Sequence, residues 1–344
     1  MTPLALDEME VRTVVDEVAP AKVAPVDIAW RQDVRRALDQ HAFSSLFSSP
    51  YWLEVLERSY GFEVRAAFTA DPTCGALYYV HVDDIRGERL VSLPFSDYCD
   101  PLVDDRRTWH RLAQPLLDTG LPVRLRCLRN TIPVADPRFT VTGRALWHGC
   151  DLSRSEGEIW AALGGSARRN IRHARRAGVS VRVGRSADDV RCFHTLHARL
   201  RKQKYRMLAQ PRAFFENLWE AFVPAEHIAV LLAELDGTPV AGILLLEWQG
   251  RLYYKFNASL ELACRPNDLL AWHAMLVGQE RGLTLFDFGI SDLTQPGLIR
   301  YKRKYASSER EVIFLDRSPV PLARPREKEA SRMLGSVTRL LTEP

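Results

Sequence analysis

One stretch carries much of the structural information in this chain: Leu283-Thr-Leu-Phe-Asp-Phe-Gly-Ile-Ser-Asp-Leu-Thr-Gln-Pro-Gly-Leu-Ile-Arg-Tyr-Lys-Arg-Lys-Tyr305. Its first residues are β-formers, which predicts a buried strand that stops at the glycine turn Asp287-Phe-Gly289. A polar loop follows, and Pro296 then begins a helical segment whose cations are Arg300, Lys302, Arg303 and Lys304. A carboxylate at a strand end beside clustered cations is typical of a substrate site at the mouth of an α/β sheet. A salt-bridged surface turn is the alternative.

The bulk composition is that of an ordinary globular protein. The chain has 344 residues, of which 46% are hydrophobic and 26% charged, and this length allows two domains. No apolar run approaches the roughly 20 residues that span a bilayer, and the acidic N-terminal stretch lacks the features of a signal peptide. We therefore expect a cytoplasmic protein. The six cysteines are scattered without metal-ligand spacing, so free thiols are expected and no metal site is predicted.

Charge is distributed unevenly along the chain. The net charge is +4, but residues 166–206 contain 13 Lys and Arg against two acids, a local charge of +11 that leaves −7 for the rest. A segment this basic favours a polyanionic partner such as a phosphate, a tRNA or an anionic lipid headgroup. A solvated helix face that binds nothing specific is the alternative.

The two halves of the chain repeat the same order of predicted elements. Each half has a strand hairpin that contains a glycine, a further strand, a proline before a helix, and another strand. The spacing from Gly75 to Pro101 is 26 residues, and that from Gly242 to Pro266 is 24. This order predicts a duplicated α/β unit with a mixed, α+β type of sheet.

We expect four segments along the chain. They are a flexible leader over 1–27, an N-terminal domain over 28–149, a C-terminal domain over 150–316 that carries the site, and a tail over 317–344. In the tail, an apolar stripe predicts an amphipathic helix. It either docks on the protein body or forms a peripheral membrane contact. The stripe consists of Met333, Leu334, Val337, Leu340 and Leu341.

Three motifs together resemble the FemAB-like transferases: SARRNIRHARRAGVSV from Ser166, FNAS with RPNDLLAWHAM and RGLTLFDFG from Phe256 to Gly289, and GLIRYKRKYA from Gly297. The resemblance runs from about Phe47 to Leu315. It implies two tandem GNAT-like (acyl-CoA N-acyltransferase) units. Family members related to peptidoglycan bridge enzymes transfer an aminoacyl group from aminoacyl-tRNA to an amine of a cell-wall precursor, while others are known only as acetyltransferases.

The resemblance also implies roles for several residues. Tyr301-Lys302 matches an aromatic–lysine pair that handles the aminoacyl ester, and the ammonium of Lys302 would stabilise the oxyanion. Tyr254 and Asn257 would face the same channel, and Arg201 would hold a substrate phosphate.

Further candidates come from the basic and acidic residues. Arg168 and Arg172 are expected to bind substrate from the basic segment, and Asp287 is either a substrate contact or a strand cap. Three acids follow the first-half strand, Asp97, Asp100 and Asp104, and we expect Asp104, which best matches the family position, to act in proton removal.

Two departures from the family pattern restrict the possible acceptor and the possible acyl donor. Leu56 stands where the peptidoglycan branch has a lysine that binds a nucleotide pyrophosphate, which argues against a UDP-muramyl acceptor. The chain also lacks the Gly-rich loop with which ordinary GNAT enzymes hold the coenzyme A pyrophosphate, which argues against acetyl-CoA.

The sequence therefore predicts an acyltransferase that transfers an aminoacyl group from aminoacyl-tRNA, or an acyl group from a CoA ester, to an amine of a cell-envelope or saccharide-linked acceptor. No cofactor beyond this donor is expected, and the oligomeric state is not indicated. The alternative is a non-catalytic module that binds RNA or an anionic membrane through residues 166–206.

Overall fold

The computed structural model of the protein describes residues 21–26, 32–69, 74–84, 86–259 and 263–318. The described strands form one twelve-stranded sheet with the order β1-β2-β3-β4-β5-β12-β6-β11-β10-β9-β8-β7. The strands are β1 Lys22–Pro25, β2 Val64–Phe68, β3 Ala76–Val82, β4 Arg89–Val91, β5 Val123–Cys127, β6 Thr140–Asp151, β7 Ser180–Gly184, β8 Ile228–Leu235, β9 Thr238–Trp248, β10 Arg251–Ser259, β11 Leu285–Asp292 and β12 Ser308–Arg317.

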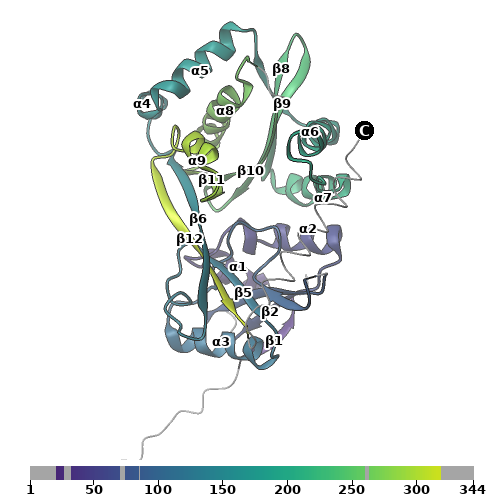
Figure 1. The fold of residues 1–344 in the computed structure, drawn as a ribbon, viewed down its shortest axis with the longest axis vertical. Helices are drawn as coiled ribbons and strands as arrows, with labels where there is room; N and C mark the ends of the chain where they lie inside the picture. The colour runs from purple at the N-terminus through teal and green to yellow at the C-terminus, as the bar shows by residue number, and fades with distance from the viewer. Residues whose placement is uncertain (1–20, 27–31, 70–73, 85, 260–262, 319–344) are drawn as a thin grey trace, which may run out of the picture.

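Helices cover both faces of this sheet and divide the molecule into two lobes (Figure 1). The N-lobe contains β1–β5 with α1–α3, and the C-lobe contains β7–β11 with α4–α9. The helices are α1 Gln32–Gln40, α2 Pro50–Tyr60, α3 Arg106–Asp118, α4 Glu156–Ala162, α5 Gly165–Arg176, α6 Ala187–Leu200, α7 Arg212–Phe222, α8 Pro266–Glu280 and α9 Pro296–Lys302. Short turns of other helix types lie at η1 Leu46–Ser48, η3 Arg201–Tyr205 and η4 Val223–Ala225.

The two lobes repeat one α/β unit, which confirms the predicted fold class. In the N-lobe, β2, β3 and β4 are antiparallel neighbours, and β5 returns parallel to β4 after α3. In the C-lobe, β8, β9 and β10 are antiparallel neighbours, and β11 returns parallel to β10 after α8. Because a parallel pair needs a crossover, the helix between the paired strands lies on a face of the sheet in each lobe.

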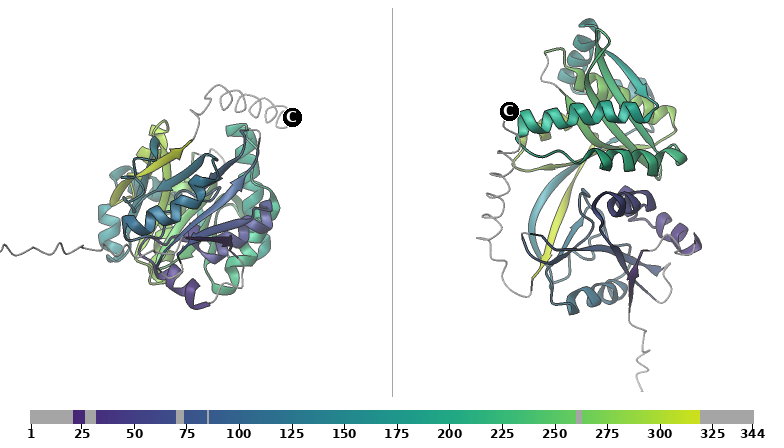
Figure 2. Two further views of the ribbon diagram at one scale, coloured as in Figure 1. Left: turned by 90° about the horizontal axis from the view of Figure 1, so that it is seen from below. Right: turned by 90° about the vertical axis from the view of Figure 1, so that its right-hand side faces the viewer.

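The last strand of each unit pairs with the other unit. The strand β6 follows β5 in the chain but pairs with β11, and β12 follows β11 but pairs with β5. They also pair with each other, from Ser308 opposite Gly149 to Asp316 opposite Thr140. The right-hand view of Figure 2 shows these two strands running between the lobes. The sheet is therefore continuous, with its internal repeat joined by the exchanged strands.

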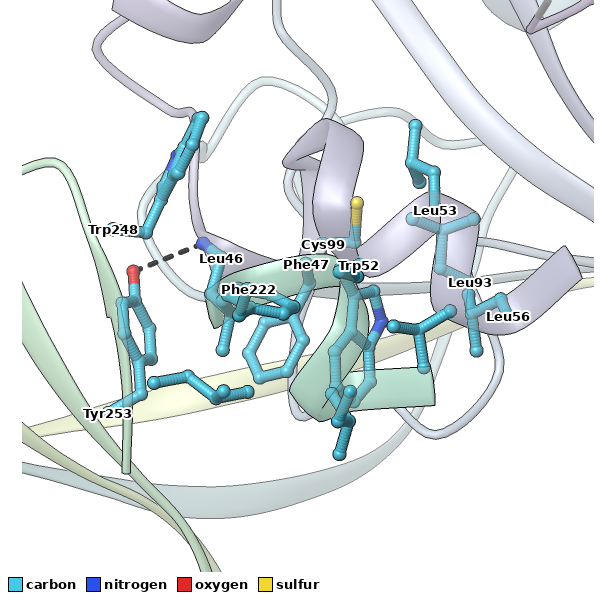
Figure 3. Close-up of a cluster of buried hydrophobic side chains, with 14 of the residues drawn as sticks. Leu46, Phe47, Trp52, Leu53, Leu56, Leu93, Cys99, Phe222, Trp248 and Tyr253 are labelled. Atoms are coloured by element: carbon cyan, nitrogen blue, oxygen red, sulfur yellow. Dashed lines mark hydrogen bonds between the residues drawn. The ribbon is translucent and has the colours of Figure 1, made fainter. Parts of the chain in front are cut away.

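Aromatic packing also holds the lobes together. The rings of Phe47 and Trp52 lie 5.4 Å apart at the start of α2, and Phe47 also contacts Tyr253 of β10 at 6.0 Å. The backbone N–H of Leu46 donates to the hydroxyl of Tyr253 at 3.2 Å, as Figure 3 shows. Burial of each such large side chain contributes about 1.5–3 kcal/mol, so this contact fixes the position of the N-lobe against β10.

Local sequence accounts for several helix ends. The side chain of Ser49 caps α2 by accepting from the N–H of Trp52, and Gly61 ends the helix in the left-handed conformation. The helix α6 is continued by the π-helical turn η3. The helix α5 begins at Gly165 without a side-chain cap, since Gly164 is at its N-cap position.

Two predictions about the chain's course are corrected. Gly289 does not end the strand, since β11 continues to Asp292 and the glycine forms a bulge between Asp287 and Ile290 with φ of +66°. The expected leader contains β1, which pairs with β2. The amphipathic tail helix and its apolar stripe lie outside the described residues.

Candidate functional site

The site lies where the two parallel strands of the C-lobe separate. The strands β10 and β11 are paired from Arg251 opposite Leu285 to Tyr253 opposite Asp287. Beyond that point β10 continues along β9, and β11 continues along β6 through its bulge. Beyond this point the backbone N–H and C=O groups on the facing edges of β10 and β11 no longer pair with each other, so they need other hydrogen-bond partners.

Lys302 supplies one of those partners. It lies at the end of α9, its side chain is buried with 5% exposure, and its Nζ donates to the carbonyl oxygen of Ile290 at 2.7 Å. Burial lowers the pKa of Lys302 to about 8, although the carboxylates of Asp97 and Asp287 act in the opposite direction. A lysine in this environment titrates near neutral pH and bears a positive charge that water screens poorly.

Asp97 faces Lys302 from the N-lobe. Its Oδ1 accepts from Nζ of Lys255 at 3.0 Å, and its Oδ2 accepts from the backbone N–H of Ile290 at 3.4 Å. Burial alone would raise the pKa of Asp97, but Lys255 and, less strongly, Lys302 hold it below its ordinary value. The carboxylate is therefore ionised at neutral pH, paired with Lys255 and within the electrostatic influence of Lys302.

Lys255 is positioned by aromatic rings as well as by Asp97. Its Nζ lies 4.6 Å from the ring centre of Phe47 and 5.0 Å from that of Trp52. It also donates to the carbonyl oxygen of Phe95 at 3.1 Å. Cation–π contacts favour this desolvated position, so the interlobe aromatic cluster and the charged site form one unit.

Asp287 lies beneath the bulge and is almost completely buried. One oxygen accepts from the hydroxyl of Tyr98 at 2.8 Å and the other from the backbone N–H of Gly289 at 2.7 Å. Burial raises the pKa of Asp287 against the effect of these hydrogen bonds. Asp287 therefore does not cap a strand end. Its buried carboxylate accepts the hydrogen bonds that hold the bulge.

The bulge gives a prediction for Gly289→Ala. The left-handed φ disfavours any L-residue by about 1–2 kcal/mol, and a methyl group would overlap Oδ2 of Asp97. We expect a lower unfolding midpoint in denaturant and a loss of activity, because Asp97 must move. Gly297→Ala is the matched control, since Gly297 lies in α9 with nothing near its missing Cβ. Equal midpoints for the two variants would contradict this account.

Three of the predicted substrate residues share one polar and aromatic network near Lys302. The hydroxyl of Tyr301 donates to the carbonyl oxygen of Asn267 at 3.1 Å. The amide of Asn257 donates to the side chain of Asn267 at 3.1 Å. Burial raises the pKa of Tyr254, whose ring lies 5.5 Å from that of Phe288. These contacts bring Tyr301, Tyr254 and Asn257 to the same end of the separated strands.

The structure does not bring Asp104 to this site. Asp104 precedes α3 in the N-lobe, whereas α9 lies in the C-lobe (Figure 1). Its side chain is 76% exposed and lies 3.5 Å from Nε2 of His41. Asp97, from the same loop, occupies the place beside Lys302 that was expected for Asp104.

The predicted basic contacts lie on the outer helices of the C-lobe. Arg168 donates to the carbonyl oxygen of Ala161 at 2.9 Å, and Arg172 lies over the ring of Trp160. Arg201 begins η3 and lies over Tyr205, and burial lowers its pKa. Arg168 is thus held in a structural contact, whereas Arg201 lies beside Tyr205, which is a neighbour of Tyr254.

Two residues of the site were missed from the sequence. Lys255 lies in an apolar strand and Tyr98 lies between candidate acids, and both act through contacts across more than 150 residues of chain. The sequence signal available was a single lysine among β-forming residues in β10, which is unusual for a buried strand.

Comparison with known proteins identifies the domain. Residues 165–303 match the family of acetyltransferase (GNAT) domains. The chain has a tandem GNAT fold, since the N-lobe repeats the unit of the matched C-lobe. It thus carries an acyltransferase domain, and Lys302 and Lys255 both lie within the matched residues.

Solved structures share this tandem GNAT fold across nearly the whole chain. The structure of FemX matches at 13% identity with a TM-score of 0.64, covering 94% of this chain and 100% of that one. L-PGS from Bacillus licheniformis matches at 16% identity and a TM-score of 0.56, covering 91% and 98%. A tandem GNAT protein from the clavulanic acid biosynthesis pathway matches at 12% identity and a TM-score of 0.55, covering 88% and 99%. No curated protein matches the sequence.

The helices of this tandem GNAT protein give no transmembrane candidate. Within the part of the chain that the structure describes, none is both long and apolar enough to cross a bilayer. All six cysteines are free thiols, as expected.

Proposed function

We propose that the protein transfers an aminoacyl group from aminoacyl-tRNA to an amine of a cell-envelope or saccharide-linked acceptor. The observation that carries this proposal is the buried ammonium of Lys302 at the separation of β10 and β11, 2.7 Å from the Ile290 carbonyl oxygen. A positive charge in a desolvated position stabilises an oxyanion that forms beside it far better than one in water.

In the proposed reaction the acceptor amine attacks the carbonyl carbon of the aminoacyl ester. The carbon–nitrogen bond forms, negative charge develops on the carbonyl oxygen, and Lys302 stabilises that charge. Asp97 accepts the proton from the attacking nitrogen, because its carboxylate is ionised beside Lys255. The ester carbon–oxygen bond then breaks, and the proton passes to the departing ribose oxygen. No covalent intermediate with the enzyme is required.

The basic surface of the C-lobe supports a tRNA donor over a CoA ester. Four arginines of α5 are exposed, and none lies within 4.0 Å of a carboxylate of the described residues: Arg169, Arg172, Arg175 and Arg176. Exposed guanidinium groups of this kind suit the phosphates of an RNA. The start of α8, where a GNAT fold would hold a CoA pyrophosphate, has Arg265 in a left-handed conformation followed by Pro266 in place of glycines.

The test is consumption of the donor. The protein is incubated with charged tRNAs and, separately, with acyl-CoAs, together with amine acceptors, and loss of the ester or thioester is followed. We expect amine-dependent loss of aminoacyl ester. Consumption of acyl-CoA alone would show that the donor is a CoA ester and not aminoacyl-tRNA. Consumption of neither donor would contradict the proposal.

The alternative, a non-catalytic module that binds RNA or an anionic membrane, rests on the same arginines of α5. Replacement of Lys302 distinguishes the two functions, because in the enzyme it should lower turnover about 10²–10³-fold while RNA binding stays unchanged. If replacing Lys302 has no effect on any turnover while binding persists, the alternative is favoured.

The exposed arginines give a further prediction. Arg175→Gln with Arg176→Gln should weaken tRNA binding about tenfold and lower the slope of log Kd against log salt by about 2, because two phosphate contacts are lost. The matched control is Arg106→Gln with Arg107→Gln, which removes the same charge from exposed positions of α3 in the N-lobe. Equal losses in the two double variants would show that only net charge matters.

A further inference from the structure

A cavity of about 270 Å³ lies between the lobes, and neither Lys302 nor Asp97 lines it. The N-lobe contributes residues that follow β4 and β5, and the C-lobe contributes the first residues of β10 and β11. The exchanged strands β6 and β12 supply the remaining wall. The lining residues are Tyr98, Leu128, Arg129, Trp147, Arg251, Leu285, Ser308 and Arg310.

Three guanidinium groups in this lining lack a direct ion-pair partner. Among the described residues, no carboxylate lies within 4.0 Å of Arg129, Arg251 or Arg310, although most other arginines of the sheet have one. Burial lowers the pKa of Arg129, and the nearby charge of Arg251 lowers it further, while Asp100 acts less strongly in the opposite direction. Asp287 lies near Arg251 without pairing with it, so the lining keeps an excess of positive charge.

Arg129 is also incompletely satisfied. One Nη donates to the carbonyl oxygen of Ser44 at 2.6 Å, but Nε is buried and has no hydrogen-bond partner. A buried donor without an acceptor costs about 1–3 kcal/mol, and an acceptor in the cavity would remove that cost. Trp147 and Leu285 supply apolar walls beside these donors.

We propose that this cavity binds a small phosphate-bearing anion. Guanidinium groups bind phosphate oxygens in pairs of parallel hydrogen bonds, and three of them match the charge of a phosphate or pyrophosphate group. The volume is near the lower end for ligand sites, which fits a phosphorylated small molecule and excludes a duplex or a folded RNA. The exposed position of Arg310 places the entrance at the surface between the lobes.

The site is distinct from the reacting centre, but one residue touches both. Tyr98 lines the cavity, and its hydroxyl is engaged by Asp287 on the other side. The binding of an anion does not depend on the identity of the acyl donor. It is therefore tested by direct binding to the full chain, whatever the outcome for acyl transfer.

Isothermal titration with inorganic pyrophosphate and with glucose 1-phosphate, at fixed ionic strength, tests the proposal. We expect saturable one-site binding, and Arg251→Gln and Arg310→Gln should each weaken the Kd about tenfold or more, the effect of losing a hydrogen bond to a charged group. Arg310 is exposed, so its variant is expected to fold normally and to have an unchanged unfolding midpoint. Tighter binding of the sugar phosphate would show that the apolar walls take part.

Arg106→Gln is the control of equal charge, because Arg106 is exposed on α3 of the N-lobe and does not line the cavity. Its Kd should stay within about twofold of the unmodified protein's. Equal weakening by Arg106→Gln and Arg310→Gln would overturn the proposal, since the anion would then bind the general positive field. Absence of saturable binding to either probe would overturn it as well.

Discussion

Replacing Lys302 with methionine is expected to lower kcat/KM for acyl transfer by about 10²–10³-fold, the loss typical of removing one oxyanion donor. Methionine keeps the length and apolar character of the side chain but cannot carry the charge. Because the charge is needed only when the oxyanion forms, kcat should fall while KM changes little. Steady-state kinetics at saturating acceptor would measure both.

The same variant is expected to be at least as stable as the unmodified protein. Burial lowers the pKa of Lys302 from 10.5 to about 8, so the folded state holds the proton less tightly than the unfolded state does. Removal of the charge should therefore raise the free energy of unfolding at pH 7 by at most about 3 kcal/mol, a gain reduced by about 1–3 kcal/mol because the Ile290 carbonyl loses its donor. A strong loss of stability in the methionine variant would instead identify Lys302 as a structural ion-pair partner.

The titration of Lys302 has a signature of its own. Between about pH 8 and pH 10.5 the unfolded chain keeps a proton that the folded protein has lost, so this group makes the unmodified protein more stable as the pH rises. The methionine variant should lack that slope. Activity should move the other way and fall above about pH 8, as the ammonium is lost. Arg300→Met, an exposed change on the same helix, is the control for both measurements.

Asp97→Asn is expected to lower kcat by about 10²-fold, within the usual contribution of a general base. The asparagine keeps the shape, but its single amide oxygen can accept from Lys255 or from Ile290 and not from both, and it cannot take a proton. Because the Asp97 carboxylate raises the pKa of Lys302, its loss should move the alkaline limit of the pH–rate profile below about 8. An unmoved alkaline limit would contradict the placement of the Asp97 carboxylate beside Lys302.

Comparison with Asp104→Asn decides between the two acids. Asp104 is exposed and faces His41, and its replacement should affect activity far less than that of Asp97. A larger loss in the Asp104 variant would show that the N-lobe loop rearranges when substrate binds.

The sequence predicted the fold and one half of the site. The order of hairpin, helix and strand is local information, since it depends on periodicity and on turns at Gly and Pro, and the repeat was therefore visible. Lys302 was predicted because it lies in a motif with Tyr301. The resemblance implied a role for both residues as a pair, and both lie beside the separated strands.

The other half of the site could not be predicted, because it comes from the second lobe. The sequence alone does not distinguish Asp97 from Asp100 and Asp104. Only the position of the N-lobe brings Asp97 to Lys255. Asp100 instead accepts three backbone N–H groups after β5, and Asp104 lies at the surface. The bulge at Gly289 was missed for a similar reason, since Asp-Phe-Gly ends a strand as readily as it interrupts one.

The exchange of β6 and β12 has a consequence for how this protein can be divided. A fragment that ends after β6 would lack β12, and so would leave β5 and β6 each with an unpaired edge. The converse fragment would leave β11 and β12 without β6. Neither repeat is a self-sufficient module, even though the two have the same plan. Calorimetry should show a single melting transition, and separately expressed halves should aggregate unless they are produced together.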